Sequence, residues 1–122
     1  MVQPIGFGPH QDEERVMAEK PVVVVAIFRA ADGKLDQLRQ ALVESIPAVH
    51  AEDGCELYAI HDAPDDHIYM LEKWTSRAAL DAHSAGEPVR QLGERVNGLT
   101  AAPTEVIVMD PIAAGTPAQG LL

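Results

Sequence analysis

Hydrophobic and polar positions alternate most regularly in residues 67–80, HIYMLEKWTSRAAL. Successive side chains of a strand point to opposite sides, so every second residue of the first eight shares one face. That face carries Ile68, Met70, Glu72 and Trp74. Ser76 then offers an N-cap oxygen ahead of good helix formers. The pattern predicts a strand over 67–74 that leads into a helix over 77–83, with the single Trp of the chain at the end of the strand.

Two earlier segments show different patterns. Residues 21–28, PVVVVAIF, are apolar without alternation, which is typical of a strand covered on both faces. From residue 34, apolar residues recur at spacings of three and four, which predicts a helix with one stripe facing the sheet. Gly54 is expected to end this helix in a left-handed conformation.

The remaining segments complete the order of elements. Residues 55–62 predict a strand that forms a hairpin with the strand over 67–74. Pro88 begins a further helix, and residues 104–109 predict a last strand. The order is strand, helix, hairpin, two short helices and strand. It predicts an α+β fold of the ferredoxin-like kind, a four-stranded antiparallel sheet with helices on one face.

The domain boundaries follow from these segments. Residues 21–112 make one domain, which suits a chain of 122 residues. Residues 1–20 are expected to be a loose extension or a short helix, and 113–122 a flexible tail rich in Pro, Gly and Ala. The helices cover only one face of the sheet, yet residues 21–28 are apolar on both. A second copy of the chain is the simplest cover for the other face, so we expect a homodimer.

Composition excludes several classes of partner. Nineteen acidic residues against nine basic ones give a net charge of −10, which argues against binding to nucleic acid or to an anionic membrane. No apolar run approaches the ~20 residues of a membrane span, and no secretory signal is visible, so a cytoplasmic location is expected. With Cys55 as the single cysteine, no intrachain disulfide and no thiolate metal cluster is expected within one chain.

Residues 44–92 carry a series of motifs with a family resemblance. A helix with Pro near its end leads into E-D-G-C, and a Tyr follows three residues after the Cys. E-x-W, S-x-x-A-L-x-x-H and a helix led by Pro come next. The series resembles the antibiotic biosynthesis monooxygenase family, and the likeness extends over about residues 22–111. It implies a dimeric α+β barrel in which two sheets face each other.

The resemblance also implies a chemistry. Members of the family include oxygenases that act on phenolic or quinol substrates with molecular oxygen and without metal or flavin. Such a reaction needs a base, an anchor for the developing oxyanion and a dry pocket. By position, Trp74 and His83 would be catalytic, and Tyr58, Glu72 and Trp74 would contact the aromatic substrate. No cofactor and no metal would be required.

Three positions depart from the family pattern. The haem-degrading branch has an Asn and a haem-ligating His where this chain has Ala26 and, approximately, Gly93. Haem degradation is therefore the less favoured reading. Many oxygenase-like members have a second His where this chain has Val89. The alternative is a non-catalytic dimeric protein that binds a small molecule or serves as an accessory protein.

The residues alone allow other roles. Trp74 could fill the core, and His83 could complement the dipole of a helix end. Glu72 could be a buried base or the ion-pair partner of Arg77 or Arg90, and we favour the ion pair. The His and Asp residues of the segment 61–67 favour a solvated loop over a metal site.

Overall fold

The computed structural model describes residues 20–122, so the predicted N-terminal extension lies outside this part except for Lys20. Each predicted strand and helix of the domain is present. In chain order the elements are β1 (Val22–Arg29), α2 (Leu35–His50), β2 (Cys55–Ala63), β3 (His67–Trp74), α3 (Arg77–Ser84), α4 (Glu87–Val96), β4 (Glu105–Met109) and α5 (Pro117–Gly120). Only α5 has no counterpart in the sequence-based prediction.

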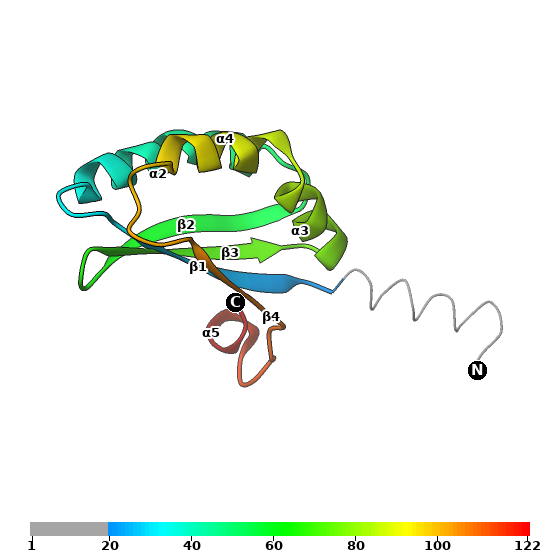
Figure 1. Ribbon diagram of the computed structural model, residues 1–122. Coiled ribbons are helices and arrows are strands. Elements are labelled where there is room, and N and C mark those ends of the chain that lie inside the picture. Colours follow the sequence, from blue (N-terminus) through cyan, green and yellow to red (C-terminus); the bar gives the residue numbers. More distant parts are fainter. Residues whose placement is uncertain (1–19) are drawn as a thin grey trace.

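The four strands form one antiparallel sheet in the order β2-β3-β1-β4. In the register, Ala26 of β1 lies opposite both Met70 of β3 and Val106 of β4. Figure 1 shows α2, α3 and α4 together on one side of this sheet. This arrangement is the predicted ferredoxin-like α+β fold. Within residues 20–122, no helix is long and apolar enough to cross a membrane.

The core lies between the sheet and α2, because the strand face predicted to point inward meets the apolar stripe of that helix. Met70 and Trp74 of β3 and Leu38, Leu42 and Val49 of α2 are completely buried. Burial of each side chain of this size stabilises the fold by about 1.5–3 kcal/mol. The alternation in β3 is thereby confirmed, since Ile68 and Glu72 are buried on the same face.

Gly54 joins the end of α2 to β2 in the predicted left-handed conformation, with φ of +84°. A Cβ at this position would lie 2.6 Å from the Cβ of Ala79 and 2.8 Å from Oγ1 of Thr75. The backbone N–H of Thr75 donates to the Gly54 carbonyl at 2.9 Å. Position 54 therefore requires glycine for two reasons, its left-handed backbone and the lack of space for a Cβ. The contact holds the end of α2 against the start of α3.

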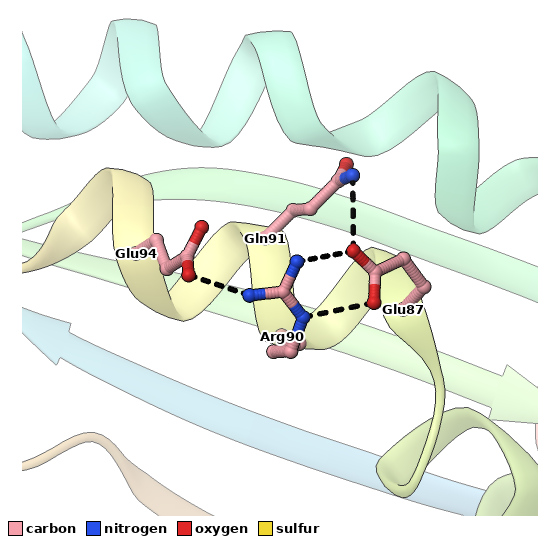
Figure 2. Close-up of polar contacts among 4 residues, drawn as sticks. All are labelled: Glu87, Arg90, Gln91 and Glu94. Carbon is pink, nitrogen blue, oxygen red and sulfur yellow. Dashed lines mark hydrogen bonds and ion pairs between the residues drawn. The ribbon is translucent and has the colours of Figure 1, made fainter.

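The two short helices begin as the sequence predicts. Ser76 caps α3, since its Oγ accepts from the backbone N–H of Ala79 at 3.0 Å. Pro88 lies in the first turn of α4. On the solvent side of α4, Arg90 donates to both Glu87 and Glu94, and Figure 2 shows this network. The opposite side of α4 buries Leu92 and Val96 against the domain.

The C-terminal segment turns onto the other side of the sheet. In Figure 1, α5 lies on the side opposite to α2 and α4. The single turn of α5 is closed by the backbone N–H of Gly120, which donates to the Thr116 carbonyl at 2.7 Å. The flexibility of residues 113–122 stays a prediction.

Candidate functional site

A cavity of about 260 Å³ lies between the inner face of the sheet and the helices α3 and α4. All four strands contribute to its wall, from Ala26 of β1 to Val106 of β4. Its volume is close to the lower end of the range of ~300–1,000 Å³ usual for ligand sites. The wall is mainly apolar, with a few polar groups, as in most sites for small organic molecules.

Three titratable side chains of the wall are almost fully buried. Tyr58 is 4% exposed, Glu72 5% and His83 4%. Each comes from a different element, namely β2, β3 and α3. No Lys or Arg of residues 20–122 lines the cavity. The structure thus brings together three of the residues that the sequence had singled out.

His83 has a carboxylate partner that the sequence analysis missed. Its Nδ1 lies 2.8 Å from Oε2 of Glu52, whose side chain is 17% exposed. An ionised carboxylate can only accept, so Nδ1 donates to it, and a neutral imidazole then has its lone pair on Nε2. Nε2 has no hydrogen-bond partner among residues 20–122. An imidazole oriented by a carboxylate in this way is equipped to act as a general base.

The tertiary fold, and not the local sequence, places Glu52 beside His83. It lies just beyond the C-terminus of α2, two residues before Gly54, and the close contact of Gly54 with Ala79 brings it near α3. The one signal in the sequence was its place at the head of E-D-G-C. Read locally, that motif indicates only the end of a helix.

Glu72 is held by the indole of Trp74, whose Nε1 donates to Oε1 at 3.0 Å. The pKa of the Glu72 carboxyl is raised, mainly because the side chain is buried. The hydrogen bond from Trp74 and the nearby His83 lower this pKa in part, and the charge of Glu52 raises it. Oε2 has no hydrogen-bond partner among residues 20–122.

The ion pair that the sequence analysis favoured for Glu72 is wrong. Arg77 pairs with Asp81 on α3, and Arg90 is held in the solvent-facing network of Figure 2. Both arginines therefore lie on exposed helix surfaces, whereas Glu72 points inward. The strand face of Glu72 was predicted correctly, and it is this face that separates the carboxylate from the surface cations.

Trp74 lies behind the wall of the cavity and is completely buried. Its ring centroid is 4.5 Å from that of His83, with the two planes 32° apart. Trp74 is therefore not among the residues that line the cavity, and its predicted catalytic role stays a prediction. Its contacts with His83 and Glu72 make it a support for two groups that do line the cavity.

Tyr58 meets the His83 ring edge to face, with centroids 5.5 Å apart and planes at 68°. Burial is the main reason why the pKa of the Tyr58 phenol is raised far above its usual range, and the charges of Glu72 and Glu52 add to it. The hydroxyl therefore stays protonated and can donate a hydrogen bond. No partner for this hydroxyl occurs among the described residues.

The positions that depart from the family pattern also line the cavity. Ala26, Val89 and Gly93 all belong to its wall. None of these side chains carries an atom that could coordinate iron or accept a proton. The residues at these positions therefore do not supply the ligand and the amide that the haem-degrading branch uses.

The polar cluster of the β2–β3 hairpin has a structural role. Arg39 of α2 donates to Asp62 at 3.0 Å, and Nδ1 of His67 contacts the Pro64 carbonyl at 3.0 Å. In residues 20–122 no group of three or more His, Cys, Asp or Glu side chains is arranged to hold a metal ion.

Burial raises the pKa of the Cys55 thiol, which disfavours the reactive thiolate.

Comparison with known proteins gives relatives that match most of the chain. The model of the family described as antibiotic biosynthesis monooxygenase matches residues 21–95. The Mycobacterium tuberculosis protein that bears the name "Putative monooxygenase Rv0793" is 31% identical over 93 residues, which span 75% of this chain and 92% of that protein. Its solved structure aligns with a TM-score of 0.72 at 30% identity and covers 80% of this chain and 100% of that chain.

Two further crystal structures share the fold. SO0527 from Shewanella oneidensis aligns with a TM-score of 0.63 at 28% identity, over 75% of this chain and 94% of that chain. PA3566 from Pseudomonas aeruginosa aligns with a TM-score of 0.70 at 24% identity, over 79% and 98% of the respective chains. The protein is thus an α+β protein of ferredoxin-like fold with a mainly apolar cavity between its sheet and its helices. It belongs to the antibiotic biosynthesis monooxygenase family.

Proposed function

We propose that the protein is a monooxygenase that oxidises a phenolic or quinol-type small molecule with molecular oxygen and without a cofactor. The observation that carries the proposal is the Glu52–His83 pair, which presents an imidazole to an apolar cavity. His83 removes the proton of a substrate hydroxyl, and Glu52 orients the imidazole. Tyr58 and Glu72 contact the bound ring system and its hydroxyls, and Trp74 supports His83 and Glu72 from behind.

The reaction balances with oxygen as the one oxidant. A hydroquinone loses a hydroxyl proton to His83 and becomes an electron-rich anion, which reacts with O2 at a ring carbon. One oxygen atom stays on the ring, and the other leaves as water. The four electrons that O2 accepts come from the hydroquinone, which becomes a hydroxylated quinone. The apolar wall excludes water from the anion during these steps.

Oxygen uptake tests this function. The purified protein is given a panel of hydroquinones and hydroxylated naphthalenes, and consumption of O2 is followed with an electrode. The wild type is expected to consume O2 at least ~100-fold faster than His83→Gln, since a general base contributes about 100- to 10,000-fold. His61→Gln is the matched control, because His61 is exposed on β2. Equal rates for the wild type and His83→Gln would contradict the proposal.

A second candidate is a non-catalytic protein that binds a small molecule or serves as an accessory protein. It is favoured by Val89, which lines the cavity at the position of a second His in many oxygenase-like members. This protein would be stabilised by a phenolic ligand and would not turn it over. A rise in Tm with added ligand, together with no uptake of O2, would support it over the oxygenase.

We also propose that the protein is a homodimer that forms through the outer face of the sheet. On this face, Tyr69 of β3 and Ile107 and Met109 of β4 are 38–42% exposed. Large apolar side chains in such a row favour association with another surface. Light scattering is expected to give twice the mass of 13.1 kDa. Ile107→Glu is expected to give a folded monomer, and Val43→Glu on exposed α2 is the control that stays dimeric.

A further inference from the structure

Among residues 20–122, the cavity wall carries a single acidic side chain and no Lys or Arg. Glu72 is 5% exposed, and only its Oε1 is bound, by Trp74 at 3.0 Å. Oε2 is a buried acceptor without a partner in the described part of the chain. A buried polar atom of this kind is costly unless a ligand satisfies it.

We propose that Glu72 makes the site selective for uncharged hydroxylated aromatic ligands and against aromatic ligands that carry a carboxylate or another anionic group. This inference rests on the proposed function of the same cavity. A ligand hydroxyl donates to Oε2 and supplies the missing partner. A ligand carboxylate would bring a second negative charge into an apolar cavity, where no Lys or Arg of the described residues offsets it.

The neighbouring groups strengthen this selection. Glu52 adds negative charge behind His83, at 2.8 Å from its Nδ1. The buried Tyr58 remains a neutral phenol, which can donate to a carbonyl or a hydroxyl of an uncharged ligand. Of the two arginines of α4, Arg90 is held by Glu87 and Glu94 on the solvent side of that helix (Figure 2). The other, Arg95, donates to Oγ of Ser45 on α2 at 3.2 Å. A bound anion would thus lie in a site with two carboxylates, Glu72 in the wall and Glu52 behind His83.

Two probes of nearly equal size test the inference. 1-Hydroxy-2-naphthamide is neutral, and 1-hydroxy-2-naphthoate carries a carboxylate in the same place. Their Kd values are measured by titration calorimetry in the absence of oxygen, with wild-type protein, Glu72→Gln and Glu56→Gln. Glu56→Gln is the matched control, because it removes the same charge from a residue of β2 that does not line the cavity. The Glu56 carboxylate pairs with Lys73 at 3.6 Å.

In the wild type the amide is expected to bind at least ~10-fold more tightly than the carboxylate, which corresponds to about 1.4 kcal/mol. Glu72→Gln is expected to reduce this ratio to about two-fold or less by tightening the binding of the carboxylate. Glu56→Gln should keep the wild-type ratio. Retained binding of the amide by Glu72→Gln shows that the variant is folded and its cavity intact.

Equal Kd values for the two probes in the wild type would overturn the inference. An equal loss of selectivity in Glu56→Gln and Glu72→Gln would also overturn it, since the effect would then be one of net charge. Failure of the wild type to bind the neutral amide overturns it as well. Because oxygen is absent, selective binding upholds the inference even where the oxygen-uptake assay rejects a monooxygenase, so the two failures are distinguishable.

Discussion

The two sides of the cavity differ in chemistry although one fold builds both. On one side, β2, β3 and α3 present Tyr58, Glu72 and His83. Trp74 holds Glu72, and Glu52 holds His83. On the other side, β1 and α4 present small or apolar side chains, including Ala26 and Val89. Both sides thus shape the cavity, and the titratable side chains of its wall are confined to one side. Substitutions on each side test how far this division explains function.

The largest effect is expected from Gly54→Ala, which should damage the polar side from a distance. The substituted residue must adopt a φ of +84° and contact Ala79 and Thr75, so α2 and α3 must move apart and Glu52 must leave His83. The variant should lose about 2 kcal/mol or more of its free energy of unfolding in urea, together with most of its oxygen uptake. Gly33→Ala is the control, because Gly33 has a φ of +72° and no atom within 4 Å of the added Cβ. Equal losses in both variants would show that the contact at Gly54 is unimportant.

Glu52→Gln should have the next largest effect. The amide keeps the shape of the side chain and removes the charge that orients the imidazole, so kcat should fall about ten-fold, a part of the about 100- to 10,000-fold that a general base supplies. KM should stay unchanged, since Glu52 acts through His83 and does not line the cavity. Steady-state oxygen uptake measures both constants. A rise in KM at constant kcat would contradict the role of Glu52 as a positioning residue.

Val89→His tests the apolar side by adding a second imidazole to the wall. We expect kcat to rise about three-fold, well below the ~100-fold of a supported base, because no carboxylate of the described chain is placed to orient the new ring. Arg90→His is the control, since the side chain at this neighbouring position faces solvent (Figure 2). An unchanged or lower kcat in Val89→His would show that the apolar side serves only to shape the cavity.

The smallest effect concerns the pH dependence of stability. Because the folded protein raises the pKa of Glu72, its native state binds this proton more tightly than the unfolded chain does. The contribution of Glu72 to stability is present at low pH and is lost as pH rises above the ordinary Glu value of about 4.3. The stability of Glu72→Gln relative to the wild type should therefore increase with pH. Urea unfolding between pH ~4 and ~8 measures this difference, and a constant difference would contradict it.

The sequence predicted the fold more fully than the site. Alternation in residues 67–74 and the cap at Ser76 are local signals, and they gave β3 and α3 correctly. The contact between Glu52 and His83 joins residues that are 31 positions apart, so no periodic pattern contains it. Side-chain parity placed Trp74 on the inner face. Parity could not predict that the Trp74 ring packs against His83, because this contact depends on how α3 packs across β3.

The buried Trp74 also gives the protein an optical reporter. It is the single Trp of the chain, and its indole lies against His83 and donates to Glu72. Any event that charges the imidazole, draws the carboxylate toward a ligand or admits water to the cavity changes the surroundings of this one fluorophore. Intrinsic emission excited selectively at the indole can therefore be assigned to the site without labelling. Binding and protonation at the cavity can be followed in real time with the unmodified protein.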